Sequence, residues 1–370
     1  MRLSRLVLLM TLVSLAGCSR RGEEEPLLVG HVVPLSGRDR LVGEHTQRGM
    51  RLGLEEANEI PPIAGRRVAV VHADSRGDPA RARAEAVRLA TVNKVLAVLG
   101  GEPDDVERLV AAVGPYSLPL LTAAAPRNSA NQEGVFSLDV TPDFRGEVLA
   151  RFADKELKAD RAAVLVDDSR PLCVAVASAF TRKWQSGEKK KTLRTPRFDP
   201  KAEGSNLAGL LREVQVLVFA GTAKDFVRVR AALEKEKTTP KFIFAGEAAE
   251  WARLVADLDA GRGVYAANVY APPGLTKDGK HFAATYRKQF DEGPDLYAFE
   301  GYELASVIVE ALRETRGIGG AKLREELAKD REFQGLTGTF RFNQGHAVRS
   351  LYVLRRGQEE QATEYKAESP

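Results

Sequence analysis

The sequence predicts an α/β fold made of two doubly wound parallel sheets. Before residue 125, four short apolar segments alternate with three amphipathic helices, which is the pattern of a parallel sheet covered by helices. The alternation starts again after residue 143 and continues to residue 270. A chain of 370 residues is longer than one hydrophobic core usually holds. We therefore expect two lobes.

The first lobe is predicted from its strands and from the signals that start its helices. Residues 29–58 contain a strand, the turn Pro34-Leu35-Ser36-Gly37 and a helix with apolar residues at helical spacing. Asp78, followed by Pro79, is expected to cap the second helix. Asp74 and Asp78 are interpreted as turn and cap residues rather than ligands. The remaining strands are expected at residues 68–72, 95–99 and 118–122.

The second lobe repeats this alternation without visible repetition of sequence. Its strands are expected at residues 162–166, 193–198, 216–220, 242–245 and 264–270, with helices between them. Near the end of the chain, apolar segments at residues 339–342 and 351–354 flank the turn Asn343-Gln344-Gly345. This pattern predicts a hairpin.

The N-terminus carries an export signal. Arg2 and Arg5 precede an apolar run over residues 6–15, and Leu15-Ala16-Gly17-Cys18 follows. Its form resembles the bacterial lipobox, in which the cysteine is lipidated. A plain signal peptide or an anchor helix is the alternative, but the run is shorter than the about 20 residues that span a bilayer. We expect residues 1–17 to be removed, Cys18 to carry the lipid, and residues 18–26 to form a tether.

Charge and motifs argue against several classes of function. The formal net charge is +4 and falls to +2 when Arg2 and Arg5 are removed, and both signs are interspersed, so no nucleic-acid surface is predicted. Beyond Cys18 only Cys173 remains, which predicts a buried thiol and no disulfide within the chain. The sequence lacks a nucleophile elbow and a phosphate-binding loop, and its five histidines lack metal-ligand spacing. We predict no enzyme activity, metal or cofactor.

At the start of the first lobe, a strand ends in a Pro-x-Ser-Gly turn at Pro34, Ser36 and Gly37, and a glycine-containing helix closes at Asn58. This order resembles a known family, the branched-chain amino-acid binding proteins, which are type I periplasmic solute receptors of ABC transporters. Residues 296–305 are similar to the family's aromatic-x-x-Gly-Tyr-Asp-Ala segment, with Glu303 in the acidic place. The resemblance covers nearly all of residues 28–355. The residues that match the start of the family are Pro34, Ser36, Gly37, Gly43, Gly49 and Asn58.

The resemblance implies the periplasmic binding protein type I fold, whose two lobes are joined by a hinge of three strands. The matching crossings would fall near Pro142, Pro272 and Gly345. The N-terminal lobe would then comprise residues 27–142 with 272–344. The C-terminal lobe would comprise residues 143–271 with 345–358, followed by a polar tail over residues 359–370.

The ligand site is expected at the carboxyl ends of the strands of both lobes. In the resembled family, hydroxyl and backbone N–H groups hold the carboxylate of an amino acid, and an acid holds its ammonium group. Glu247 occupies the place of that acid, and Thr122 and Ala124 fall near the carboxylate-binding backbone. The predicted ligand-binding residues are Ser36, Gly101, Glu102, Thr122, Ala124, Ser169, Arg170, Thr222 and Glu247. For Thr222 the alternative is a cap on the helix after Gly221.

Three departures from the family pattern affect the ligand. Acids at residues 102–105 stand where the family offers serines, and the aromatic side chains expected near Val42 and Leu172 are absent. A ligand carboxylate at residues 102–105 would meet like charges. We therefore expect a cationic or neutral ligand, unless Arg170 or Arg127 replaces the lost carboxylate-binding groups.

The sequence thus predicts a lipid-anchored solute-binding protein of the cell envelope. It would capture an amino acid or related compound between its lobes and deliver it to an ABC permease in the inner membrane, as the resemblance implies. The alternative is an envelope lipoprotein of the same fold that acts as a regulator or sensor through protein contacts. No nucleic-acid partner is expected.

Overall fold

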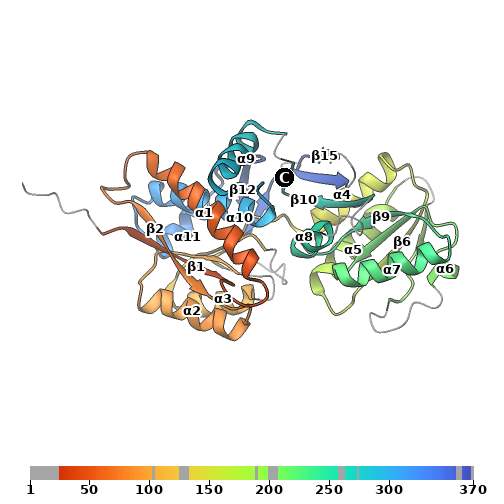
Figure 1. The fold of residues 1–370 in the computed structure, drawn as a ribbon, viewed down its shortest axis with the longest axis horizontal. Coiled ribbons are helices and arrows are strands. Elements are labelled where there is room, and N and C mark those ends of the chain that lie inside the picture. The colour runs from red at the N-terminus through yellow and green to blue at the C-terminus, as the bar shows by residue number, and fades with distance from the viewer. Residues whose placement is uncertain are drawn as a thin grey trace, which may run out of the picture.

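Two sheets, each flanked by helices, lie side by side in the computed structural model (Figure 1). The structure describes residues 25–101, 105–124, 133–187, 191–198, 207–256, 263–272, 275–355 and 361–367. The chain folds into the two mixed α/β sheets that the alternation of strands and helices predicts. No helix within these described ranges is both long and apolar enough to cross a membrane.

The first sheet has eight strands in the order β11-β12-β13-β5-β4-β3-β1-β2. Strands β1 to β5 pair in parallel, and antiparallel pairs are confined to β11, β12 and β13 at one edge. The strands are β1 (Leu27–Val33), β2 (Val68–Asp74), β3 (Val98–Gly100), β4 (Leu120–Thr122), β5 (Val135–Ser137), β11 (Phe333–Gly335), β12 (Gly338–Asn343) and β13 (His346–Val348).

Helices cover both faces of this sheet, and one pair is unusually close. α1 (Arg40–Glu59) and α10 (Leu296–Glu314) meet at Gly49 and Gly301. A Cβ atom at either glycine would collide with a backbone carbonyl of the other helix, so these positions require glycine. The other helical segments are α2 (Pro79–Thr91), α3 (Val106–Val113), the 3₁₀ turn Gly114–Tyr116, α9 (Lys277–Phe290) and α11 (Ala321–Leu327).

The second sheet has seven strands in the order β15-β14-β10-β9-β8-β6-β7. Strands β6 to β10 pair in parallel with one another, and β14 and β15 add antiparallel pairs at one edge, beginning with β10 and β14. The strands are β6 (Arg161–Val166), β7 (Thr192–Arg194), β8 (Val216–Ala220), β9 (Lys241–Phe244), β10 (Val264–Asn268), β14 (Leu351–Arg355) and β15 (Gln361–Tyr365). The helices are α4 (Pro142–Lys155), α5 (Pro171–Gln185), α6 (Leu207–Leu210), α7 (Ala223–Lys235) and α8 (Ala248–Ala256).

The C-terminal strands differ from the sequence-based prediction. β12 forms its hairpin with β13, not with residues 351–354, so the predicted partner was wrong. His346 also pairs in parallel with Ser137, which keeps β13 in the first sheet and puts the third crossing at residues 349–350. Where a polar tail was expected, β15 pairs along β14, because Ala362 and Tyr365 pack against the second lobe's cores.

Two buried ion pairs lie at the crossings. Arg349 donates two hydrogen bonds to the carboxylate of Glu303, at 2.6 and 2.9 Å, and a third to the hydroxyl of Thr337. At the first crossing, Arg145 pairs with Asp139 and also donates to the carbonyl oxygen of Ala267. Each arginine therefore ties together segments that are distant in sequence.

Candidate functional site

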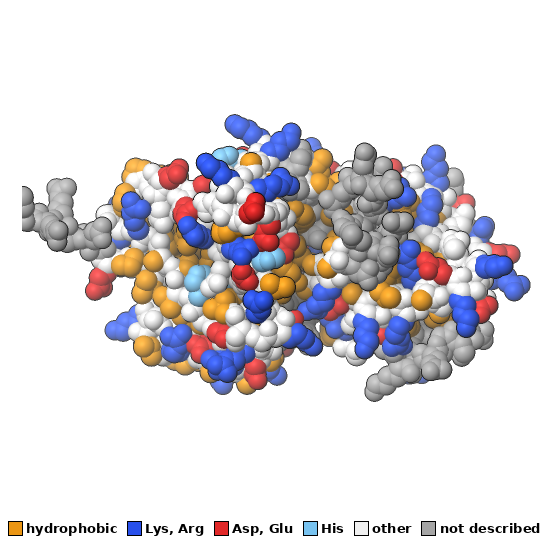
Figure 2. All heavy atoms as spheres, in the orientation of Figure 1, with side chains coloured by type: hydrophobic (Ala, Val, Ile, Leu, Met, Phe, Trp, Pro, Cys, Tyr) orange, Lys and Arg blue, Asp and Glu red, His pale blue; other side chains and the backbone are white. Residues whose placement is uncertain are grey.

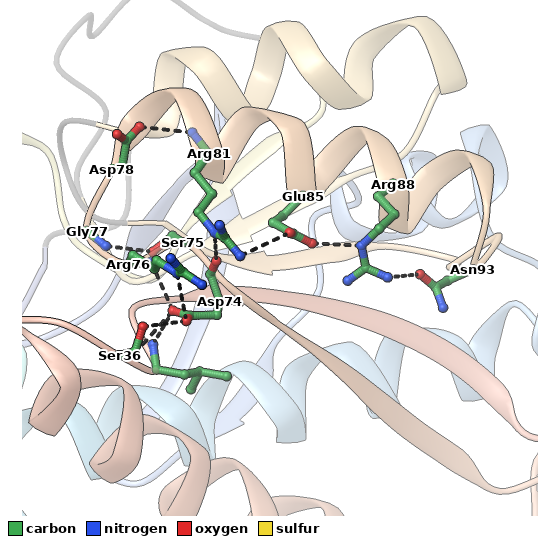
Figure 3. Close-up of polar contacts among 11 residues, drawn as sticks. Ser36, Asp74, Ser75, Arg76, Gly77, Asp78, Arg81, Glu85, Arg88 and Asn93 are labelled. Carbon is green, nitrogen blue, oxygen red and sulfur yellow. Dashed lines mark hydrogen bonds and ion pairs between the residues drawn. The ribbon is translucent and has the colours of Figure 1, made fainter.

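The predicted turn after β1 is held in place by one carboxylate. Asp74, the last residue of β2, accepts hydrogen bonds from the backbone N–H groups of Leu35 and Ser36 and from the Ser36 hydroxyl, at 2.6 Å (Figure 3). Burial opposes the charge of Asp74, but these bonds and one from Arg76 outweigh it and lower its pKa. The hydroxyl of Ser36 thus already has a partner within its own lobe.

The next predicted loop on this lobe is built around buried hydroxyls. Thr122 is fully buried, donates to the carbonyl oxygen of Gly101 and accepts from the N–H of Ala124. The Ser137 hydroxyl donates to the carbonyl oxygen of Ala124. Gly101 and Ala124 are half-buried, so the structure leaves this loop's backbone, rather than the Thr122 side chain, at the surface of the lobe.

Three residues of the sequence prediction lie outside the described residues: Cys18, Glu102 and Arg127. The lipid anchor and the acidic loop of residues 102–104 stay predictions.

The second lobe brings two of the predicted site residues together. Arg170, at the start of α5, lies 2.8 Å from Glu247, which directly precedes α8. The Arg170 and Glu247 side chains are 23% and 9% exposed. Burial opposes the charge of Arg170, but Glu247 outweighs it and raises the arginine pKa. The Arg170 Nε is buried and has no hydrogen-bond partner among the described residues.

The remaining predicted side chains of this lobe stabilise their own loops. Ser169 donates from both its N–H and its hydroxyl to Asp167. Thr222 is the N-cap of α7 and accepts from the N–H of Asp225, as its position after Gly221 suggested. Cys173 is buried as predicted, and burial followed by the charge of Glu247 raises its pKa to about 12, so the thiol stays protonated.

A cavity of about 530 Å³ lies between the lobes. The first lobe contributes the start of α1 and of α10, and the second contributes α8. Arg253 of α8 donates to Glu250 at 2.5 Å, and another of its nitrogens lies 3.9 Å from Asp39 of the first lobe. Aromatic and charged residues that line this cavity are Asp39, His45, Trp251, Arg253, Tyr270 and Tyr297.

These lining residues were missed by the sequence-based reasoning. Trp251 was assigned to a helix and Tyr297 to the segment that resembles the family. No signal in the sequence places α8 opposite the start of α1. Asp74 was interpreted correctly as a turn residue. Within the described ranges, no group of three or more His, Cys, Asp or Glu residues is arranged to hold a metal ion.

The fold and this geometry define a class of protein. Two α/β lobes joined by three crossings, with a polar and aromatic cavity between them, form a two-lobed receptor for small molecules. The chain matches the family model for periplasmic binding proteins over residues 26–361. It belongs to the periplasmic binding protein family. A search of curated proteins finds no match.

Solved structures with this fold include receptors of several kinds. A leucine-binding protein, LivK, from Thermotoga maritima is 20% identical with a TM-score of 0.75, and the match covers 92% of this chain and 99% of that chain. LivJ from Streptococcus pneumoniae, in complex with isoleucine, is 18% identical with a TM-score of 0.76, over 92% and 100% of the two chains. A solute-binding protein from R. palustris, in complex with 4-hydroxybenzoate, is 17% identical with a TM-score of 0.77, over 94% and 98%.

Proposed function

We propose that this protein captures an amino acid or a related small carboxylate between its two lobes for an ABC importer. The observation that carries the proposal is the pair of opposite charges formed by Arg170 and Glu247 in the loops that follow β6 and β9 of the second lobe. A zwitterion can place its carboxylate on the arginine and its ammonium group on the glutamate, in charge-assisted hydrogen bonds. Arg170 thus takes the role that the sequence left open for a cation.

The rest of the proposed site supplies backbone groups and apolar surface. Gly101 and Ala124 offer backbone groups from the first lobe, while Ser36, Thr122, Ser169 and Thr222 shape their loops through the bonds described above. Trp251 and Tyr297 offer aromatic surface for a ligand side chain. The named complexes with isoleucine and 4-hydroxybenzoate in proteins of this fold support a carboxylate ligand.

Binding would proceed by closure of the lobes about the three crossings. Ligand contacts to both lobes favour the closed state, which is a shift of population between open and closed forms. We propose the lobe division as residues 27–142 with 272–348 and residues 143–271 with 351–367, which follows the sheet order. We also propose that Cys18 is lipidated and that the protein docks on a permease. Labelling with a radioactive fatty acid tests the anchor: the wild type should take up the label and Cys18→Ala should not.

The experiment is a thermal-shift screen of the chain from residue 19 against amino acids, aromatic acids, polyamines and short peptides. A ligand that binds only the folded state raises the melting temperature in proportion to the logarithm of its concentration. We expect a dose-dependent rise with at least one amino or aromatic acid and its loss in Glu247→Ala. No rise with any compound, repeated on refolded protein, would contradict the proposal and favour a regulator that acts through protein contacts.

A further inference from the structure

A second cavity lies beside the chain crossings and shares no lining residue with the cavity between α1 and α8. Its volume is about 520 Å³, within the roughly 300–1,000 Å³ of small-molecule sites. Its walls come from both lobes. The second lobe supplies α4 and α5, and the first supplies β13 and the turn that joins it to β12.

The wall from the first lobe is uncharged and rich in hydrogen-bonding groups. Asn343 and Gln344 contribute side-chain amides, and His346 contributes an imidazole that is 7% exposed. The His346 Nδ1 has no hydrogen-bond partner among the described residues. Buried polar atoms nearly always have a partner, so an orphaned nitrogen in a cavity wall marks a place for a ligand group.

The wall from the second lobe is cationic. Lys183 is exposed on α5, and Arg151 of α4 lies with its guanidinium 5.9 Å from the ring centre of Phe144. Of the two acids in this wall, Asp143 is already paired with Arg182. With Arg182, three cations therefore lie at this wall against two carboxylates, those of Asp143 and Glu147.

We propose that this second cavity binds a small hydroxycarboxylate. Its carboxylate would lie against Lys183 and Arg151, and its hydroxyl would reach the amides and the His346 nitrogen. A site with walls from two lobes changes shape when the lobes move. A bound hydroxycarboxylate would therefore change the affinity of the main cleft, and the main ligand would change the affinity of this cavity by the same factor.

The test is a thermal-shift and calorimetric titration of the chain from residue 19 with malate and tartrate, and with erythritol and sorbitol as neutral comparators. We expect saturable binding of a hydroxycarboxylate and none of the polyols. Lys183→Glu should weaken binding at least tenfold, whereas Lys235→Glu, the same change at an exposed position of α7, should not. His346→Gln should weaken the binding of malate more than the binding of succinate, because succinate lacks the hydroxyl.

Glu247→Ala separates this cavity from the main site. Hydroxycarboxylate binding should persist in that variant, even if the proposed amino-acid binding fails in every experiment. Loss of the binding in Glu247→Ala would place it in the main cleft and overturn the inference. Three other results would overturn the inference. These are equal effects of Lys183→Glu and Lys235→Glu on binding, a rise in melting temperature with the polyols, and no saturable binding of malate or tartrate.

Discussion

Two arginine–glutamate pairs in this protein have the same chemistry and different surroundings. Glu303 and Arg349, between α10 and the third crossing, are 1% and 2% exposed, and the carboxylate also accepts from the N–H of Leu336. The arginine lies over the rings of Phe299 and Phe340. Both side chains of this pair are therefore surrounded by protein groups.

The pair of Glu247 and Arg170 is less complete. It is held by one contact of 2.8 Å, its arginine is 23% exposed, and the Nε of that arginine lacks a partner among the described residues. The two pairs thus differ in how many of their polar atoms have protein partners, and the proposed function assigns the ligand to the less complete pair. Both side chains of the incomplete pair come from one lobe. On the face of the molecule drawn in Figure 2, basic and acidic side chains are interspersed.

The largest expected effect is at the saturated pair. Glu303→Ala leaves the Arg349 charge buried without its carboxylate, which costs about 3–5 kcal/mol of unfolding free energy. Urea unfolding monitored by circular dichroism measures the loss. The double variant Glu303→Leu with Arg349→Met should recover most of it, since an apolar pair of similar size replaces the charges. A single variant as stable as the wild type would remove the distinction between the two pairs.

The next effect is on binding at the incomplete pair. Glu247→Gln keeps the shape of the side chain but removes a charge-assisted hydrogen bond of about 1.5–3 kcal/mol, so ligand affinity should fall roughly 10- to 100-fold. The stability change should be smaller than that of Glu303→Ala. Calorimetric titration with the ligand found in the screen measures the affinity, with Glu236→Gln at an exposed position as the matched control. Unchanged affinity would refute the assignment of this pair to the site.

A pair of histidines, one buried and one half-buried, sharpens the comparison through its pH dependence. His31 and His72 face each other on β1 and β2, with their Nδ1 atoms 2.9 Å apart. Burial lowers the pKa of both below 6.5, and for His31 the neighbouring His72 adds to the effect. The neutral forms are therefore stable above pH 6.5.

As the pH falls below 6.5, the two histidines bind protons in the unfolded chain but stay neutral in the folded chain. Stability should decline by about 1.4 kcal/mol per pH unit for each such histidine until the folded pKa is reached. Thermal melts between pH 7.5 and 5 follow the decline, and His72→Gln should make it shallower. An equal slope in the variant would show that other groups, such as His346, account for it.

The smallest effect is expected at the contact between the lobes. Arg253 and Asp39 are 3.9 Å apart and partly exposed, so Asp39→Asn should change affinity by less than about 1 kcal/mol. Salt screens such a pair, and the difference from the wild type should vanish near 1 M NaCl. Titrations at low and high salt check this. A large effect that persists in salt would mean that Asp39 contacts the ligand itself.

Local signals in the sequence were sufficient for most elements and for several caps. Asp78 caps α2 with Pro79 after it, and Thr222 caps α7, because a cap depends only on residues within one turn of the helix. The partner of β12 could not be predicted, since its choice rests on the parallel pairing of His346 with Ser137, more than 200 residues earlier in the chain. The pairing of β15 was missed for a similar reason.

The sequence by itself determined the two α/β lobes, the helix starts and the buried thiol, and it predicted Arg170 and Glu247 as ligand-binding residues. Their spacing along the chain says nothing about their 2.8 Å separation, which arises because β6 and β9 flank β8 in one sheet. Only the tertiary structure decided which hydroxyls are occupied within their lobes, which ion pair is saturated, and that α8 faces α1 across a cavity. Periodicity and capping act over a few residues, whereas contacts between loops of different lobes depend on how the sheets are placed.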